Sequence, residues 1–290
     1  MLKKNLSIAI PCTVLEDCSD LRSKTQKLGQ IARACAIFKV KQIIIYSFNK
    51  RLSKRFSKDI EIIKEILEYL DCPQYLRKLI YPKLPIYRYV GILPPLRTPN
   101  HPLEKEIANI KTESNREGVV LSSNDQSSEV EIGLEKPIFI NIPNLPTKKR
   151  VILRLKKRKN KLSGVLIEKA KIKEYWGYDV QIFKDSIRNF MKKFSNYQLI
   201  ATSKKGTPIK KSDIEFFHAL GEMKDILIIF GSPSSGLFEI FENQGLKLGD
   251  WVNLIINIAP KQGTQTIRVE EALLSTLTLV TWFISNLSNK

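Results

Sequence analysis

The chain has 290 residues, and its 48 Lys and Arg residues outnumber its 29 Asp and Glu residues, so the formal net charge is +19. Unless the whole proteome is basic, this excess favours a polyanionic partner, either nucleic acid or an anionic membrane. The four cysteines and two histidines lack the spacing of metal ligands, which argues against a metal site. No apolar run is long enough to cross a bilayer or to act as a secretory signal, so we expect a cytoplasmic protein with reduced cysteines and no membrane partner.

Strands and helices alternate over the first part of the chain. The expected strands are Leu6–Ile10 and Gln42–Tyr46, and the expected helices are Leu21–Phe38 and Asp59–Leu70. Apolar residues of the first helix recur at helical spacing, whereas the second strand is a continuous apolar run. This order predicts a parallel sheet with helices on its faces.

The character of the sequence then changes. Segment 82–102 is rich in proline, which excludes a regular helix or a central strand, so we interpret it as a boundary. Short alternating runs follow between Arg116 and Glu168 and are separated by turn residues. They predict a small antiparallel barrel of about five strands, OB-like in size. We therefore expect an inserted barrel domain at 91–167 within a discontinuous α/β domain, 1–90 and 168–290.

A basic cluster lies inside the expected barrel. Residues 148–161 contain nine basic residues and no acidic one. Strand alternation would place Val151, Leu153 and Leu155 on one face and the polar residues between them on the other. A solvated face is one interpretation, but the position in an OB-like barrel favours a surface that follows an RNA phosphate backbone.

Three apolar runs near the end of the chain each lead into a loop of small residues. The runs 197–201, 225–230 and 250–258 predict buried strands, and the loops 202–206, 231–236 and 259–266 follow them. Because α/β sheets bind ligands at the carboxyl ends of their strands, the loops predict a site held mainly by backbone groups. The loops 202–206 and 231–236 match no phosphate-binding motif. The alternative interpretation is that these segments are ordinary strand-to-helix turns without a ligand.

The last loop and the last helix carry two further expectations. Pro260 fixes one backbone angle, and Gly263 is expected to supply another that other residues avoid. Helix 269–283 has apolar residues around much of its circumference, so it must be covered on more than one side. The sheet covers one side, and either the same subunit or a second subunit covers the other.

Taken together, these segments resemble the SPOUT superfamily of methyltransferases, and more narrowly its archaeal and eukaryotic RNA methyltransferase group with an inserted OB-like β-barrel. The resemblance spans most of the chain and rests on collinear segments: SIAIPCTVLEDC (7–18), LGQIARACAIFKV (28–40), YLDCPQYLRKLIYP (69–82), REGVVLS (116–122), YWGYDV (175–180), IIFGSPSSGL (228–237) and NIAPKQGTQTIRVEEALL (257–274). Cys12, Ser232 and Lys261 stand where relatives tend to carry glycine.

The resemblance implies an α/β fold whose parallel-sheet domain is tied into a trefoil knot, binds S-adenosyl-L-methionine and forms a homodimer through the knot half. The cofactor contacts that it implies, by position in the three loops, are Thr202, Ser203, Lys205, Gly206, Gly231, Ser232, Asn257, Ile258, Pro260, Gly263, Thr264 and Ile267.

Conventional catalytic groups are scarce. His101 and His218 are far apart in the sequence, and the adjacent Glu270 and Glu271 point in different directions on a helix. This scarcity fits methyl transfer, in which the protein mainly aligns the reactants. The catalytic residue is undetermined, with three arginines as candidates: Arg22, Arg33 and Arg268.

RNA contacts are expected on the first helix and on the basic barrel strand, at Arg22, Lys24, Arg33, Arg154, Lys156, Lys157, Arg158 and Lys159. Arg33 would lie on an otherwise apolar helix face and would need a carboxylate or a phosphate as its partner. The leading hypothesis is an S-adenosylmethionine-dependent methyltransferase of ribosomal RNA. The alternative is a non-enzymatic RNA-binding or ribosome-assembly protein that keeps the knotted scaffold.

Overall fold

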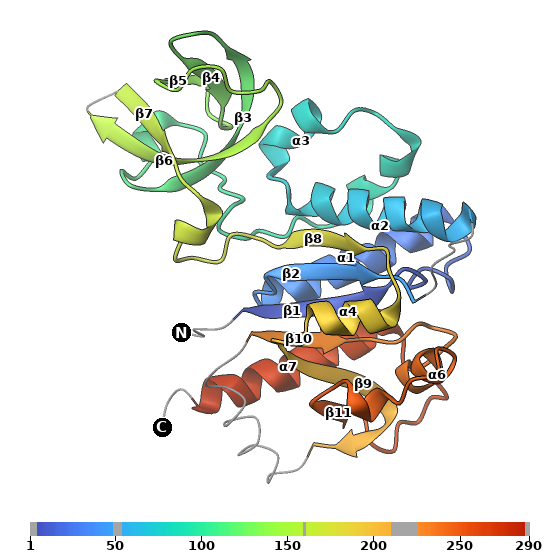
Figure 1. The fold of residues 1–290 in the computed structure, drawn as a ribbon. Helices are drawn as coiled ribbons and strands as arrows, with labels where there is room; N and C mark the ends of the chain where they lie inside the picture. Colours follow the sequence, from blue (N-terminus) through green and yellow to red (C-terminus); the bar gives the residue numbers. More distant parts are fainter. Residues whose placement is uncertain (1–4, 49–53, 159–160, 210–224, 288–290) are drawn as a thin grey trace. The chain divides into compact units, whose positions relative to one another are not determined.

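The computed structural model describes residues 5–48, 54–158, 161–209 and 225–287 (Figure 1). The chain divides into two compact units, which are described separately. The sheet unit consists of Met1–Glu68, Tyr89–Leu93 and Tyr178–Lys290, and the barrel unit consists of Tyr69–Arg88 and Pro94–Gly177.

The sheet unit is built on six strands drawn from both ends of the chain. They are β1 (Leu6–Pro11), β2 (Gln42–Tyr46), β8 (Asp179–Phe183), β9 (Gln198–Pro208), β10 (Ile226–Ile229) and β11 (Leu254–Asn257). Their order is β11-β9-β10-β1-β2-β8, and every neighbouring pair is parallel. The parallel sheet expected from the alternating strands and helices is therefore confirmed.

Helices cover the sheet. They are α1 (Leu21–Ile37), α2 (Lys54–Asp71), α4 (Ile187–Lys193), α6 (Leu237–Glu242) and α7 (Val269–Leu287), with short 3-10 turns at Val90–Ile92 and Leu248–Asp250. The start of α1 is fixed by a capping box, in which Asp20 accepts from the Ser23 backbone N–H and the Ser23 hydroxyl accepts from that of Asp20. Helix α1 packs against α7.

Both faces of the central strands are buried. On one face Ile44 of β2 and Leu227 of β10 pack with Phe190 of α4 and Phe241 of α6. The residues next to them in the strands, such as Ile43 and Ile228, are also fully buried. Strands covered on both faces have continuous apolar sequences rather than alternating ones, which is why QIIIY and DILIIF could be identified as strands.

Three elements differ from the expectation. Residues 202–206, expected as a loop, lie within β9, which continues to Pro208. Ile255 pairs with Ala201 but Ile256 pairs with Thr207, so these five positions bulge away from β11. Strand β11 begins only at Leu254 and is half-buried because it lies at the sheet edge. Strand β8, at the opposite edge, was not anticipated, because its sequence DVQIF is short and half-polar.

The barrel unit contains the five expected short strands, in an antiparallel sheet. They are β3 (Asn115–Ser123), β4 (Ser128–Glu131), β5 (Ile138–Ile140), β6 (Arg150–Arg158) and β7 (Lys161–Leu166), in the order β5-β4-β3-β6-β7. Edge strands β5 and β7 approach each other, so the sheet is nearly closed into a barrel. Val151, Leu153 and Leu155 of β6 point into its core, as their alternation predicts. The unit also holds α3 (Gln74–Ile80) and 3-10 turns at Pro85–Tyr87, Ile107–Asn109 and Lys169–Lys171.

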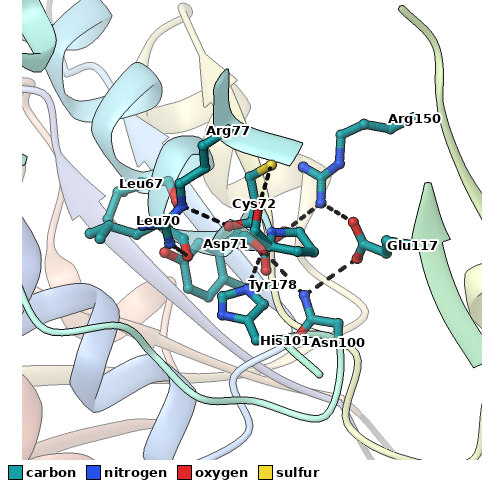
Figure 2. Close-up of polar contacts among 11 residues, drawn as sticks. Leu67, Leu70, Asp71, Cys72, Arg77, Asn100, His101, Glu117, Arg150 and Tyr178 are labelled. Atoms are coloured by element: carbon teal, nitrogen blue, oxygen red, sulfur yellow. Dashed lines mark hydrogen bonds and ion pairs between the residues drawn. The ribbon is translucent and has the colours of Figure 1, made fainter. Parts of the chain in front are cut away.

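A buried polar cluster joins distant segments of the barrel unit (Figure 2). The Arg150 guanidinium of β6 bonds the Glu117 carboxylate of β3 and lies 3.4 Å from Asp71 Oδ2. The amide Nδ2 of Asn100 donates to Glu117 Oε1 over 3.3 Å and to the Asp71 carbonyl over 3.2 Å. His101 Nε2 lies 2.7 Å from that same carbonyl. Burial raises the pKa of the Glu117 carboxyl, and the nearby Arg150 opposes that shift.

Candidate functional site

The sheet unit has a pocket of about 330 Å³ at the carboxyl ends of β9, β10 and β11. This is the edge at which open α/β sheets bind their ligands. The pocket is lined by Thr202, Ser203, Lys204, Lys205, Phe230, Gly231, Ser232, Pro233, Ser234, Gly236, Phe238, Glu239, Asn257, Ile258, Gln262, Gln265, Thr266, Ile267, Val269 and Ala272. The bulge of β9 and the two loops expected after β10 and β11 therefore line one pocket.

The first wall is the bulge of β9. The Thr202 hydroxyl donates to the Ile229 carbonyl over 3.3 Å, which ties the bulge to β10. Asn257 Nδ2 donates to the Lys204 carbonyl over 2.8 Å, and Lys204 Nζ donates to the Gln265 carbonyl over 3.2 Å. Gly206 lies outside the lining, and a Cβ there would come within 2.7 Å of the Ile256 backbone. Its glycine is needed because β11 passes so close to it.

The second wall is the turn after β10. The Ser232 hydroxyl accepts from the Ser235 N–H over 2.9 Å, and the Ser234 N–H donates to Glu16 Oε1 over 2.8 Å. Glu16 belongs to the loop between β1 and α1, so that loop braces the pocket. A Cβ at Gly231 would lie 3.2 Å from backbone atoms of residues 235–237, which leaves little room for a larger residue. The turn is thus held open toward the pocket by its own hydrogen bonds.

The third wall is the loop between β11 and α7, and here one expectation is wrong. Gly263 has no left-handed backbone angle, a Cβ there would meet nothing within 4 Å, and the residue does not line the pocket. The left-handed position is Lys261, with φ of 62°. Relatives tend to carry glycine at the position of Lys261. Glycine adopts the left-handed conformation without strain, whereas lysine does not. Pro260 and Thr264 also lie outside the lining.

The walls combine apolar surface with backbone polar groups. Phe230, Ile258 and Ile267 supply apolar side chains, and the Lys205 ammonium lies 6.0 Å from the ring centroid of Phe238. Glu239 supplies a carboxylate. Such a lining suits a ligand with a flat apolar part and a few polar groups. The aromatic and α6 residues were missed from the sequence, because α6 is only six residues long and has no periodic pattern.

The expected pocket residues fall into two groups. Thr202, Ser203, Lys205, Gly231, Ser232, Asn257, Ile258 and Ile267 line the pocket, whereas Gly206, Pro260, Gly263 and Thr264 do not. The three candidate catalytic arginines are not in the lining either. Arg268 is exposed and stands between the lining residues Ile267 and Val269. The ionisable side chains of the lining are therefore Lys204, Lys205 and Glu239, none of which was a catalytic candidate from the sequence.

The basic residues expected on α1 have different environments. Arg22 and Arg33 are exposed, so neither side chain lies on the buried face of α1. Lys24 is half-buried and forms an ion pair with the buried Asp59. A second buried pair links α1 to the start of α7, because Lys27 Nζ lies 2.7 Å from Asp17 Oδ1 and 3.2 Å from Glu270 Oε2. That pair fixes the first turn of α7 beside the pocket.

Four of the basic residues expected on β6, Arg154, Lys156, Lys157 and Arg158, are exposed or half-buried. Lys156 and Arg158 are exposed, and Arg154 is half-buried. Lys157 Nζ donates to the Ala108 carbonyl over 2.5 Å. Lys159 and His218 lie outside the described residues. Strand β6 thus presents basic side chains on the outer surface of the barrel.

Over residues 5–48, 54–158, 161–209 and 225–287, no group of three or more His, Cys, Asp or Glu side chains could hold a metal ion. In the same part of the chain, no helix is both long and apolar enough to cross a membrane.

The four cysteines are free, and burial raises the pKa of the Cys12 thiol to about 11 and that of Cys72 to about 12. These two thiols stay protonated at neutral pH and are poor nucleophiles.

A parallel sheet with a backbone-lined pocket at its carboxyl edge, joined to a small basic barrel, defines a class of ligand-binding α/β proteins with an accessory module. Comparison with known proteins identifies the family within that class. Residues 5–280 match the family described as "Putative RNA methyltransferase", and the chain belongs to that family. The resemblance to this group of RNA methyltransferases is thereby confirmed.

Curated relatives extend the comparison. The chain is 30% identical over 300 residues to the human protein named 28S rRNA (uridine-N(3))-methyltransferase, covering 94% of this chain and 76% of the relative. It is 28% identical to the mouse protein of that name, covering 94% and 74%. The Drosophila melanogaster protein of that name is also 28% identical, covering 94% of this chain and 61% of its own length.

Proposed function

We propose that this protein transfers a methyl group from S-adenosyl-L-methionine to ribosomal RNA. The observation that carries the proposal is the pocket formed by the β9 bulge and the loops that follow β10 and β11, in a chain that belongs to an RNA methyltransferase family. We further propose that the strands around this pocket are threaded as in the SPOUT knot. The parallel strand order and the family membership support that threading.

The residues present fit the adenosyl part of the cofactor. The pocket volume of about 330 Å³ lies in the usual range for small-ligand sites. Apolar side chains such as Ile258 and Ile267 would cover the adenine ring, and the loop backbone would hold its polar edge. Gly236 adds open space to one wall, because a Cβ there would meet nothing within 4 Å. The loops carry no phosphate-binding motif, which suits a ligand without phosphates.

When bound, the cofactor supplies a methyl group on a sulfonium, which is already a good leaving group. The chain's own task is to hold the acceptor base in line with that methyl and to keep water out. The relatives' names direct attention to N3 of a uridine in ribosomal RNA. We propose that the exposed Arg268, at the rim of the pocket, stabilises negative charge on the base as N3 gives its proton to solvent water. Arg22 and Arg33 remain candidates for contacts with the RNA phosphates.

Two measurements test this function. Calorimetry with S-adenosylhomocysteine tests the pocket, and transfer of labelled methyl groups to ribosomal RNA from a strain lacking the protein tests the reaction. We expect binding, and a label that maps to uridine N3. Arg268→Ala should lower the turnover rate while leaving the affinity for S-adenosylhomocysteine unchanged. RNA binding without cofactor binding or transfer would instead support the non-enzymatic scaffold.

We also propose that the protein forms a homodimer through α7. One face of this helix is buried within the subunit at Leu273, Leu277 and Val280. Leu274 and Trp282, two turns apart on another face, are 47% and 57% exposed. A two-fold interface would place this stripe against its own copy, as closed dimers do. The sequence predicts that this helix is covered on a second side. In this proposal, the partner subunit provides that cover.

Light scattering at micromolar concentration tests the dimer. We expect twice the chain mass of 33.3 kDa for the native protein. Leu274→Ser combined with Trp282→Ser should give the mass of a single chain, whereas Leu103→Ser, at a 67% exposed apolar residue of the barrel unit, should leave the mass unchanged. A native mass of one chain would refute the dimer without bearing on cofactor binding.

A further inference from the structure

The outer surface of the barrel carries two exposed apolar side chains that the pocket and the fold do not use. Phe139 on β5 is 64% exposed, and Val165 on β7 is 51% exposed. Each is the outward residue of a strand whose inward neighbours are packed in the barrel core. Exposed aromatic rings cost free energy in water, so a ring left uncovered on a small barrel indicates an interaction surface.

The approach of β5 to β7 brings these two side chains to the same part of the outer surface. A methyl group added at Gly164 of β7 would lie 3.2 Å from Cδ1 of Ile138 of β5, inside the barrel. Successive side chains in a strand point to opposite faces. Phe139, which follows Ile138, and Val165, which follows Gly164, must therefore point outward on either side of the seam between β5 and β7.

Basic side chains continue this row across the barrel. Val165 pairs with Arg154 on β6, and opposite residues of an antiparallel pair share a face. Arg154 is oriented by its neighbour on β3, because its Nε donates to Asn115 Oδ1 over 3.3 Å. Lys156 lies two residues further along the same face and is exposed. On the described part of the chain, neither Arg154 nor Lys156 forms an ion pair with a carboxylate.

The opposite side of Phe139 differs in charge. Phe139 pairs with Glu129 of β4, whose carboxylate accepts from the Ser122 hydroxyl over 3.0 Å. Arg154 and Lys156 therefore lie on the β7 and β6 side of Phe139. A chain of phosphates could follow Arg154 and Lys156 while a base reaches over Val165 to the ring of Phe139. The surface is therefore acidic on the β4 side of Phe139 and basic on the side of Arg154 and Lys156.

We propose that the row Phe139–Val165–Arg154–Lys156 binds a single-stranded segment of the RNA substrate, with one base stacked on Phe139 and the adjacent phosphates on Arg154 and Lys156. The proposal rests on the proposed function, because it assumes that RNA is the substrate. An unpaired strand fits because its bases are free to stack on an aromatic ring, whereas the bases of a duplex are not. The adjacent positive charge favours a polyanion over an apolar protein surface.

Fluorescence anisotropy with the full-length protein tests the proposal, using labelled single-stranded and hairpin RNAs of equal length. Phe139→Ala should weaken binding to the single strand by about tenfold, in line with the contribution of one stacked base. Phe139→Trp should retain the affinity, and Phe139→Leu, which keeps an apolar side chain without the ring, should weaken it like alanine. Leu103→Ala is the matched control, because Leu103 is an equally exposed apolar residue of the same unit.

The outcomes separate this proposal from the proposed function. Loss of RNA affinity in Phe139→Ala, with unchanged affinity for S-adenosylhomocysteine, supports the stacking site. Wild-type affinity for RNA in Phe139→Ala and Phe139→Leu overturns it, even if the protein methylates RNA. Equal losses on the single strand and the hairpin, or in Leu103→Ala, also overturn it. Failure of the wild-type protein to bind S-adenosylhomocysteine would sink the methyltransferase function but leave the RNA-binding result to be judged on its own.

Discussion

The two units of this protein use polar groups in opposite ways. In the sheet unit the central strands are apolar on both faces, and polar groups gather in loops at one edge, where they face a pocket. In the barrel unit charged side chains lie inside the structure, where Arg150, Glu117 and Asp71 contact one another. The polar groups at the pocket of the sheet unit can bond to a ligand, whereas the charged groups of the barrel unit bond to one another.

This difference separates stability from binding. A charge removed from the buried cluster leaves its partner without compensation in a place that water reaches poorly. A substitution in the pocket loops disturbs turns that are held by local hydrogen bonds, such as the one from the Ser235 N–H to the Ser232 hydroxyl. We therefore expect changes in the cluster to lower stability, and changes at the pocket to lower affinity while the fold survives.

The largest effect should come from Arg150. Arg150→Ala leaves the carboxylate of Glu117, whose side chain is 6% exposed, without its ion-pair partner. Because Arg150 is itself partly exposed, we expect a loss of about 3 kcal/mol in the free energy of unfolding, at the low end for a broken buried pair. Arg154→Ala, on the same strand, should change it by less than about 1 kcal/mol. Urea denaturation of both variants measures the difference, and equal losses would contradict the cluster's role.

The matching test in the sheet unit is Gly236→Val. The new side chain would enter open space at the pocket wall without meeting protein atoms within 4 Å. We expect the affinity for S-adenosylhomocysteine to fall by at least about tenfold, which is about 1.4 kcal/mol, with an unchanged thermal midpoint. Gly249→Val is the control, because Gly249 is equally unhindered but lies away from the pocket. A lowered thermal midpoint in Gly236→Val alone would assign Gly236 to the fold instead.

The same contrast explains what the sequence could predict. Strands β1, β2 and β10 are apolar on both faces, and the barrel strands alternate, so simple periodicity found them. The strand-end position of the pocket followed from the loops after them. Family resemblance added the ligand class, which periodicity could not supply.

The features that the sequence did not predict depend on contacts between distant residues. The bulge of β9 exists because β11 pairs on both sides of it, and no local pattern marks residues 202–206 as strand. Asp71, Glu117 and Arg150 are far apart in the chain and meet only when the barrel unit folds. Phe139 was overlooked because one aromatic residue in a three-residue strand gives no sign of whether it points in or out.

A pH effect of intermediate size should arise from His101. Burial lowers the pKa of this histidine from its ordinary value of 6.5, and its Nδ1 is buried without a hydrogen-bond partner. The folded state therefore resists protonation, so stability is fully present above pH 6.5 and falls as the pH drops toward the lower folded pKa. We expect a slope of up to about 1.4 kcal/mol per pH unit in that window. His101→Gln should remove this component, and identical pH profiles for the two proteins would contradict the assignment.

The smallest effects should distinguish two residues of the loop between β11 and α7. Lys261 holds a left-handed backbone angle, with φ of 62°, which disfavours any side chain by about 1–2 kcal/mol. Lys261→Gly relieves that strain but adds freedom to the unfolded chain, so we expect a net gain of about 0.5 kcal/mol in unfolding free energy. Gly263 has no such angle and open space around it, so Gly263→Ala should also stabilise, by about 0.4–1 kcal/mol. Neither change should alter the affinity for S-adenosylhomocysteine, because neither residue lines the pocket. Thermal unfolding and calorimetry on the two variants decide the matter. A destabilised Gly263→Ala would show that the loop draws its special backbone angle from Gly263, and the assignment to Lys261 would then be wrong.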